Sequence, residues 1–418
     1  MHKSLATSSK PLAAHVAFAF AALAAAGAPA AVHAQSSVTL YGIIDEGVNY
    51  TSNVQTSPGQ GHSQYSLSSG ILSGSRWGLR GNEDLGGGMK AIFVLESGFD
   101  VNNGKMGQGS LLFGRQAYVG VSNPYGTVTL GRQYDPVVDY IHPLMPSAMF
   151  SGSIGAHPGD LDNINNSNRV NNAIKYTSSN YGGFTFGGVY SLGGVAGNIS
   201  QNQIWSLGGS YYNGPLGLGV GYLNIRNPNT SFYGTSALAN TTGSAPLASL
   251  NNIASPVFSG FANARTQEVY AAGGAYTYGA ATFGGTYSNT RFDDLNGGGS
   301  GPNPFGNRGT AMFNNVEVNV KYQITPAFLV GVAYDYTKGS SVSGRDGATY
   351  HQAQAGADYF LSKRTDVYLV GAYQHASGQT RDATGTAVVN AQASVGSYGY
   401  AGTSSQELVA VGLRHLPS

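Results

Sequence analysis

The sequence of 418 residues has no cysteine, few charged residues and no long apolar run after its N-terminal region. The lack of cysteine excludes disulfide bonds and thiol chemistry. Charged residues make up 10% of the chain, whereas soluble proteins carry about 25%. A membrane-spanning helix needs ~20 apolar residues, and no internal stretch approaches that length. We therefore expect a chain that is either soluble or a membrane β-barrel.

In place of charge, the chain carries 62 glycines, 27 tyrosines and many small polar residues. Its content of 41% hydrophobic and 11% aromatic residues is too apolar for a disordered protein. The formal net charge is +1. A chain this close to neutral has no general attraction for polyanions, so we expect no nucleic-acid partner.

The first 34 residues have the pattern of an export signal. Lys3 and Lys10 precede a small apolar run, and Val32-His33-Ala34 provides a small-residue cleavage site. We predict that residues 1–34 are a signal peptide cut after Ala34, and that residues 35–418 form one domain. A retained membrane helix is the poorer alternative, because the run is short and rich in alanine.

Apolar and polar residues alternate with a period of two in several segments. In one segment the apolar residues Val316, Val318, Val320 and Tyr322 alternate with the polar residues Glu317, Asn319, Lys321 and Gln323. Residues 328–336 and 351–359 repeat the pattern. Successive strand side chains point to opposite faces, so these segments predict strands with one apolar and one polar side. A soluble sandwich with one wet face also fits this alternation.

The lengths of the turns and loops between the predicted strands distinguish these two folds. Tight turns are expected at residues 84–88, 123–126, 180–183, 213–215 and 361–364, and long polar loops at 104–109, 135–168, 227–264, 293–309 and 378–404. Short periplasmic turns that alternate with long extracellular loops are typical of outer-membrane barrels. We predict an all-β fold, a transmembrane antiparallel up-and-down β-barrel of about 16 strands, which is wide enough for an aqueous channel.

Several stretches of this predicted barrel carry a family resemblance. They are residues 37–42 (SVTLYG) with Asp45, 75–81 (SRWGLRG) with 83–86 (EDLG), 93–99 (FVLESGF), 113–120 (FGRQAYVG), 126–133 (GTVTLGRQ) and 169–176 (RVNNAIKY). Together they resemble the trimeric general porins of Gram-negative bacteria, of the betaproteobacterial type. The resemblance spans the mature chain. It implies a homotrimer in the outer membrane and a third extracellular loop, here residues 134–168, that folds into the lumen as a constriction.

Basic residues of the predicted strands are expected to face the lumen. Arg76 and Arg80 lie opposite Trp77 and Leu79, and an arginine that faces lipid costs ~2–4 kcal/mol at mid-membrane. The same reasoning turns four further basic residues inward: Arg115, Arg132, Arg169 and Lys175.

The resemblance implies that Arg76, Arg115, Arg132 and Arg169 form a basic ladder opposite an acidic loop. The predicted pore-lining acidic residues are Asp135, Asp139, Asp160, Asp162 and Glu96. Opposite charges across a narrow gap would orient dipolar solutes, and the balance of charge would set ion preference. In the alternative interpretation, the arginines pair with carboxylates such as Glu96 or Glu317 and only hold the wall rigid.

Other motifs are weak. Asp160-x-Asp162 and Asp294-x-Asn296 match only part of a calcium-loop pattern. Gly217-x-Gly219-x-Gly221 lies in a predicted strand without the helix that nucleotide binding requires. His142 and His157 are expected at solvated loop positions, with contact to the constriction as the alternative. We expect no metal, no cofactor and no catalytic residue, so the chain is not predicted to be an enzyme.

The expected function is that of a general diffusion porin, a water-filled channel for small hydrophilic solutes and ions. Two alternatives stay open: a channel selective for sugars or anions, and a surface ligand or adhesin that binds through residues 227–264. Expected partners are outer-membrane lipid, lipopolysaccharide and the barrel assembly machinery. Members of the resembled family end in an aromatic residue, whereas this chain ends in Leu416, Pro417 and Ser418. Its end therefore either frays harmlessly or impairs assembly.

Overall fold

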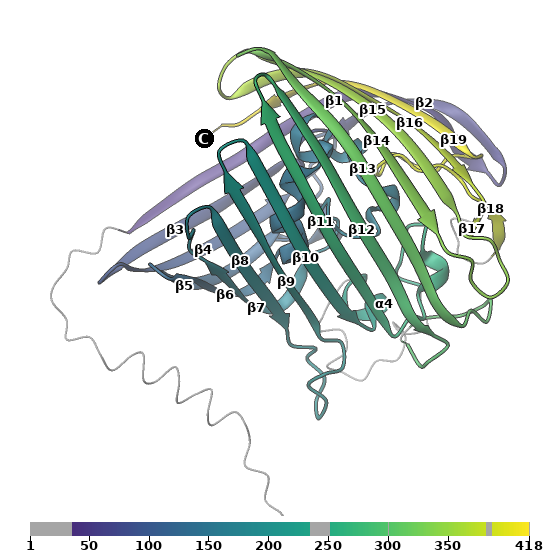
Figure 1. Cartoon of the computed structure of the whole chain (residues 1–418), viewed down its shortest axis with the longest axis horizontal. Coiled ribbons are helices and arrows are strands. Elements are labelled where there is room, and N and C mark those ends of the chain that lie inside the picture. The colour runs from purple at the N-terminus through teal and green to yellow at the C-terminus, as the bar shows by residue number, and fades with distance from the viewer. Residues whose placement is uncertain (1–35, 235–250, 300, 382–386, 418) are drawn as a thin grey trace, which may run out of the picture.

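The computed structural model describes residues 36–234, 251–299, 301–381 and 387–417. The predicted signal peptide and its cleavage site lie outside the described residues. Seventeen strands form one antiparallel sheet, and the first strand pairs with the last, so the sheet closes into a barrel (Figure 1). None of the described helices has the length and hydropathy of a membrane span.

The strands of the barrel follow one another around the ring. They are β1 (Ser37–Ser57), β2 (Gln60–Ser69), β3 (Arg76–Gly86), β4 (Met89–Gly98), β5 (Gln116–Asn123), β6 (Gly126–Gln133), β7 (Val170–Ser178), β8 (Phe184–Ser191), β9 (Ile204–Asn213), β10 (Leu216–Arg226), β11 (Thr266–Tyr278), β12 (Ala281–Leu295), β13 (Gly309–Thr325), β14 (Phe328–Gly339), β15 (Thr349–Phe360), β16 (Thr365–Ser377) and β19 (Ser405–His415). A separate ribbon consists of β17 (Gln379–Arg381) and β18 (Val388–Asn390).

The seventeen strands make a sixteen-strand barrel because β2 and β3 share one position in the ring. The long strand β1 pairs with β3 along its first part and with β2 along its second. Between β2 and β3 the chain leaves the sheet over residues 70–75, where Ile71 is fully buried. This confirms the predicted barrel of about 16 strands.

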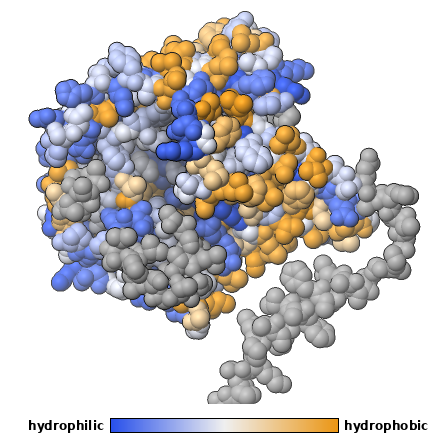
Figure 2. All heavy atoms as spheres, turned by 180° about the vertical axis from the view of Figure 1, so that it is seen from behind, coloured by the Kyte–Doolittle hydropathy of each residue, from blue (hydrophilic) through white to orange (hydrophobic). Residues whose placement is uncertain are grey.

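The predicted alternation is present in the wall. On β13, Val316 and Val318 are 47% and 55% exposed, whereas Glu317 and Asn319 between them are 1% and 3% exposed. On β19, the alternate residues Val409, Val411 and Leu413 are likewise exposed. The outer face is therefore apolar and the inner face polar. Figure 2 shows apolar side chains spread over the outer wall and polar ones toward the loop end.

Exposed aromatic side chains gather beside the short turns. Examples are Tyr125, Tyr181, Tyr278, Tyr322 and Tyr359. At the same end of the barrel, the chain terminus is held by hydrogen bonds: Leu416 N donates to Arg364 O at 2.8 Å, and Arg364 Nη1 donates to Pro417 O at 3.1 Å. The proline near the terminus is thus tied to a neighbouring turn.

The long connection between β6 and β7 folds inside the barrel, and we call residues 134–168 the constriction loop (Figure 1). It contains α3 (Pro136–Ile141), η1 (His142–Leu144), η2 (Ser147–Ser151), η3 (Gly152–Gly155) and η4 (Pro158–Asp160). Further short helices are α2 (Gly107–Ser110), α4 (Pro228–Ser231) and η6 (Ser259–Phe261).

Glycines of the wall make room for this loop. A Cβ on Gly219 would lie 2.2 Å from Tyr140 O, and one on Gly221 would lie 3.1 Å from Val137 Cα. Because the glycines of the Gly-x-Gly-x-Gly pattern carry no side chain, α3 packs directly against the backbone of β10. Farther along the loop, Phe150 lies against Gly331 of β14 and Gly356 of β15, which are direct cross-strand partners.

Candidate functional site

A cavity with a volume of about 1140 Å³ lies between the barrel wall and the constriction loop, and we call it the main cavity. Six of the predicted site residues border it: Arg76, Arg80, Arg115, Arg169, Glu96 and Asp139. Two charged residues that the sequence reasoning missed, Asp358 and Arg414, border it as well. The outward positions of Val409, Val411 and Leu413 already implied that Arg414 points inward.

Glu96 organises the basic side of this cavity. Its Oε1 accepts hydrogen bonds from Arg115 Nε at 2.7 Å and from the Tyr134 hydroxyl at 3.1 Å. Its Oε2 accepts one from the Tyr41 hydroxyl at 2.9 Å. Arg115 Nη2 also donates to Tyr134 Oη at 3.0 Å. The carboxylate thus holds one guanidinium and two phenols in fixed positions.

Three other guanidinium groups at the cavity have no ion-pair partner among the described residues. Arg80 lies 5.3 Å from the ring centroid of Tyr41, and Arg169 lies 5.5 Å from that of Tyr134. Arg169 Nη1 donates to Ser167 O at 3.1 Å. Arg76, at the start of β3, also borders the cavity. Burial and the charge of Arg115 lower the pKa of Arg169 to about 10, so this side chain remains charged at neutral pH.

Each carboxylate at the cavity has a basic neighbour. Glu96 pairs with Arg115 at 2.7 Å, Asp139 with Lys175 at 2.5 Å, and Asp358 with Arg414 at 3.3 Å, although Arg414 also pairs with Asp366 at 2.7 Å. Five arginines and three carboxylates border the cavity. The described lining therefore carries an excess of positive charge.

The remaining predicted residues lie away from this cavity. The register between β6 and β7 shifts at Arg132. The Arg132 guanidinium donates to Gly114 O at 2.8 Å and to Asn171 Oδ1. Lys175 points inward, but it is held by Asp139 and by Tyr134 O.

Three loop aspartates are buried and support the loop from within. Asp135 caps α3 by accepting from Val137 N at 2.9 Å, and burial and the charge of Asp139 raise its pKa to about 6. Asp160 accepts from two backbone amides of its own loop and borders a separate cavity of about 420 Å³. Asp162 is fully buried beside His157. Their expected contact with the main cavity is therefore not seen, because their oxygens are used within the loop.

The two loop histidines differ: His142 is half-buried, whereas His157 is buried, contrary to the expected solvated position. His142 borders the main cavity, where burial lowers its pKa to about 4, so it is neutral at physiological pH. His157 is 2% exposed, and its Nδ1 lies 2.6 Å from Asp162 Oδ2. Burial alone would lower the pKa of His157, but Asp162, Asp335 and Glu317 raise it to about 10.

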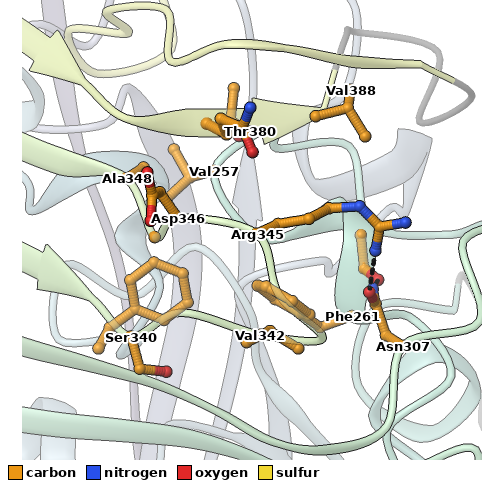
Figure 3. Close-up of a pocket in the computed structure, with 14 residues that line it drawn as sticks. Val257, Phe261, Asn307, Ser340, Val342, Arg345, Asp346, Ala348, Thr380 and Val388 are labelled. Carbon is orange, nitrogen blue, oxygen red and sulfur yellow. Dashed lines mark hydrogen bonds between the residues drawn. The ribbon is translucent and has the colours of Figure 1, made fainter.

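An apolar surface also borders the cavity, formed by the tip of the constriction loop and the wall. It consists of Met149, Phe150, Leu329 and Phe360. A further pocket under the loops, of about 40 Å³, lies between Phe261, Val342 and Ala348, where Arg345 Nη1 donates to Asn307 Oδ1 at 3.2 Å (Figure 3). That volume holds little more than one water molecule, so the large cavity is the candidate site.

Comparison with known proteins places these features in a family context. Residues 19–379 match the Gram-negative porin family. An outer membrane porin protein of Bordetella pertussis is 32% identical over 390 residues, which cover 88% of this chain and 96% of the relative.

Solved structures share the same architecture. The anion-selective porin from Comamonas acidovorans superposes with a TM-score of 0.65 at 25% identity, covering 91% of this chain and all of that one. The trimer form of OmpT from Vibrio cholerae gives a TM-score of 0.57 at 16% identity, covering 91% of this chain and 99% of that one, and thus supports the fold.

Proposed function

This chain belongs to the Gram-negative porin family and lies in the outer membrane, and we propose that it is a general diffusion channel that prefers small anions. It is a channel protein and not an enzyme. Under this proposal, the channel passes small hydrophilic solutes up to a limiting size and favours chloride-like ions over cations.

The unpaired guanidinium groups carry this proposal. Arg76, Arg80 and Arg169 border the cavity without an ion pair among the described residues, whereas the bordering carboxylates are paired. In such a lining, the uncompensated positive charge attracts a passing anion and repels a passing cation. Rings of basic side chains favour anions in pores of this kind. The similarity to the anion-selective porin from Comamonas acidovorans supports the same direction.

The polar and apolar sides of the cavity favour hydrated solutes of small size. The basic network around Glu96 orders water and dipolar groups, and the apolar tip of the constriction loop around Phe150 limits the width. Under this proposal, Arg76, Arg80, Arg115, Arg169, Glu96 and Asp139 line the pore, and residues 134–168 form its constriction. We further propose that residues 1–34 are removed before residues 35–418 insert.

We propose a homotrimer as the working assembly, on the likeness to a solved trimeric porin. The apolar outer wall requires membrane lipid around it or a neighbouring copy against it. Contact with lipopolysaccharide and insertion by the barrel assembly machinery follow from residence in the outer membrane and remain part of the proposal.

Conductance across a planar bilayer tests the function. Purified protein would be added under a potassium chloride gradient, and the reversal potential would be read from current–voltage curves. We expect ohmic steps in groups of three and a reversal potential on the chloride side. A cation-directed reversal potential would refute the anion preference, and absence of conductance in folded trimers would favour the adhesin alternative. Currents blocked in a saturable way by one sugar would instead indicate a substrate-selective channel.

A further inference from the structure

A buried cluster of ionisable residues joins the constriction loop to the barrel wall. His157 of the loop faces Glu317 of β13 and Asp335 of β14, which are direct cross-strand partners. Their exposed fractions are 2%, 1% and 0%. The cluster lies apart from the residues that border the main cavity, so the proposed ion pathway does not account for it.

The distances within this cluster are too long for hydrogen bonds. His157 Nε2 lies 3.8 Å from Glu317 Oε2 and 3.7 Å from Asp335 Oδ2, whereas an N–H···O bond spans about 2.7–3.2 Å. His157 Nε2 and both carboxylate oxygens of Glu317 have no hydrogen-bond partner in the described part of the chain. Buried polar atoms of a folded protein are normally paired, so these three atoms lack the partner that a ligand would supply.

The same distances suit a metal ion. The three ligand atoms lie within 4.8 Å of one another. A point equidistant from them lies roughly 2.0–2.4 Å from each, which matches the bond lengths of zinc to histidine nitrogen and carboxylate oxygen. One imidazole and two carboxylates also form a donor set that divalent transition metals accept.

We propose that His157, Glu317 and Asp335 bind a divalent transition-metal ion, with Zn²⁺ as the expected occupant. The ion would fasten the constriction loop to β13 and β14. On binding it would replace the proton on His157 Nε2, and that proton would leave to solvent.

The residues around the three ligands are arranged as in a metal site. Asp162 Oδ2 lies 2.6 Å from His157 Nδ1, a contact that fixes the ring so that Nε2, once its proton has left, presents its lone pair to the ion. Ser288 Oγ donates to the same Asp162 oxygen at 2.5 Å. Asn315 Nδ2 donates to Asp335 Oδ2, which orients the second carboxylate. A carboxylate behind a ligating histidine is a common device that fixes the tautomer and orientation of the ring.

Charge compensation gives a second physical reason for an ion. Three carboxylates, Asp162, Glu317 and Asp335, are buried around a single imidazole. Even a protonated imidazole offsets only one of these charges, and buried charges without partners are strongly destabilising. A dication at the cluster would offset two.

Metal analysis of the intact trimer tests the site. Wild-type protein would be stripped with a chelator, incubated with Zn²⁺ or with Co²⁺ alone, desalted and analysed for bound metal. We expect one Zn²⁺ per chain, and with Co²⁺ the visible absorption bands of a site of low coordination number. In Glu317→Gln and His157→Gln, bound metal should fall to background. Asp162→Asn should weaken binding by about 10–100-fold, as loss of such supporting carboxylates does.

His142→Gln is the matched control, because it removes the other histidine of the same loop and leaves the cluster intact. It should bind metal as the wild type does. Wild-type trimers that bind no metal would overturn the proposal, and the cluster would then hold a proton only. Equal binding in Glu317→Gln, or equal loss in His142→Gln, would also overturn it. If the cluster variants do not fold into trimers, the Co²⁺ spectrum of wild type and His142→Gln decides. Conductance is recorded separately, so the channel function and the metal site can fail independently.

Discussion

Replacement of Arg76 by glutamine should lower the preference of the channel for anions by roughly fourfold. Arg76 borders the main cavity and has no carboxylate partner among the described residues. Its full charge therefore acts on passing ions. The variant keeps a side chain of similar reach, so that charge is the main property that changes.

The size of the effect follows from the Coulomb energy. An ion that passes about 6 Å from the guanidinium gains or loses about 0.7 kcal/mol in water. Salt at ~0.1 M screens this to about 0.4 kcal/mol, because the Debye length is then about 10 Å. The sign is opposite for chloride and potassium, so their permeability ratio changes by about 0.8 kcal/mol, which is close to a factor of four.

Reversal potentials in a potassium chloride gradient measure this ratio. Arg76→Lys keeps the charge and should retain most of the preference. Lys338→Gln removes one positive charge from the outward face of β14 and should change the ratio little, since the barrel wall separates it from the lumen. Equal shifts in Arg76→Gln and Lys338→Gln would refute the reasoning, because the effect would then come from overall charge. The shift should also shrink at molar salt.

Three further predictions concern the constriction loop. In Gly331→Val, the new side chain would occupy the place of the Phe150 ring and displace the loop, so single-channel conductance should rise, whereas the outward Gly285→Val should leave it unchanged. His142, with its pKa lowered to about 4, should add positive charge only near pH 4, so the reversal potential of wild type and His142→Gln should agree at pH 7 and separate at pH 4. The pKa of Asp135 is raised from 3.8 to about 6, so the contribution of this residue to the stability of the folded loop is complete below pH ~4 and is lost as pH rises through 6. Hydrogen exchange of α3 amides, corrected for intrinsic rates, should therefore be slower at pH 5 than at pH 8. Asp135→Asn should reduce this difference.

The local sequence pattern was sufficient to predict the β-barrel fold. The alternation around Glu317 and the asymmetry of turns and loops predicted strands with one apolar face, because side-chain direction along a strand depends only on the backbone period. The same rule turned Arg76 and Lys175 toward the interior, and the resemblance located the loop that enters the lumen. These features depend on neighbours in sequence, so the sequence alone reveals them.

The tertiary structure decided which charges meet. Asp135, Asp160 and Asp162 were predicted to line the pore, but their oxygens are used by backbone amides and by His157 inside the loop. Two features were not predicted: α3 packs directly against the glycines of β10, and Arg414 borders the cavity. Burial and pairing depend on contacts between residues more than a hundred positions apart, such as His157 with Glu317. No local period encodes such contacts, because they arise only when the barrel closes around its loop.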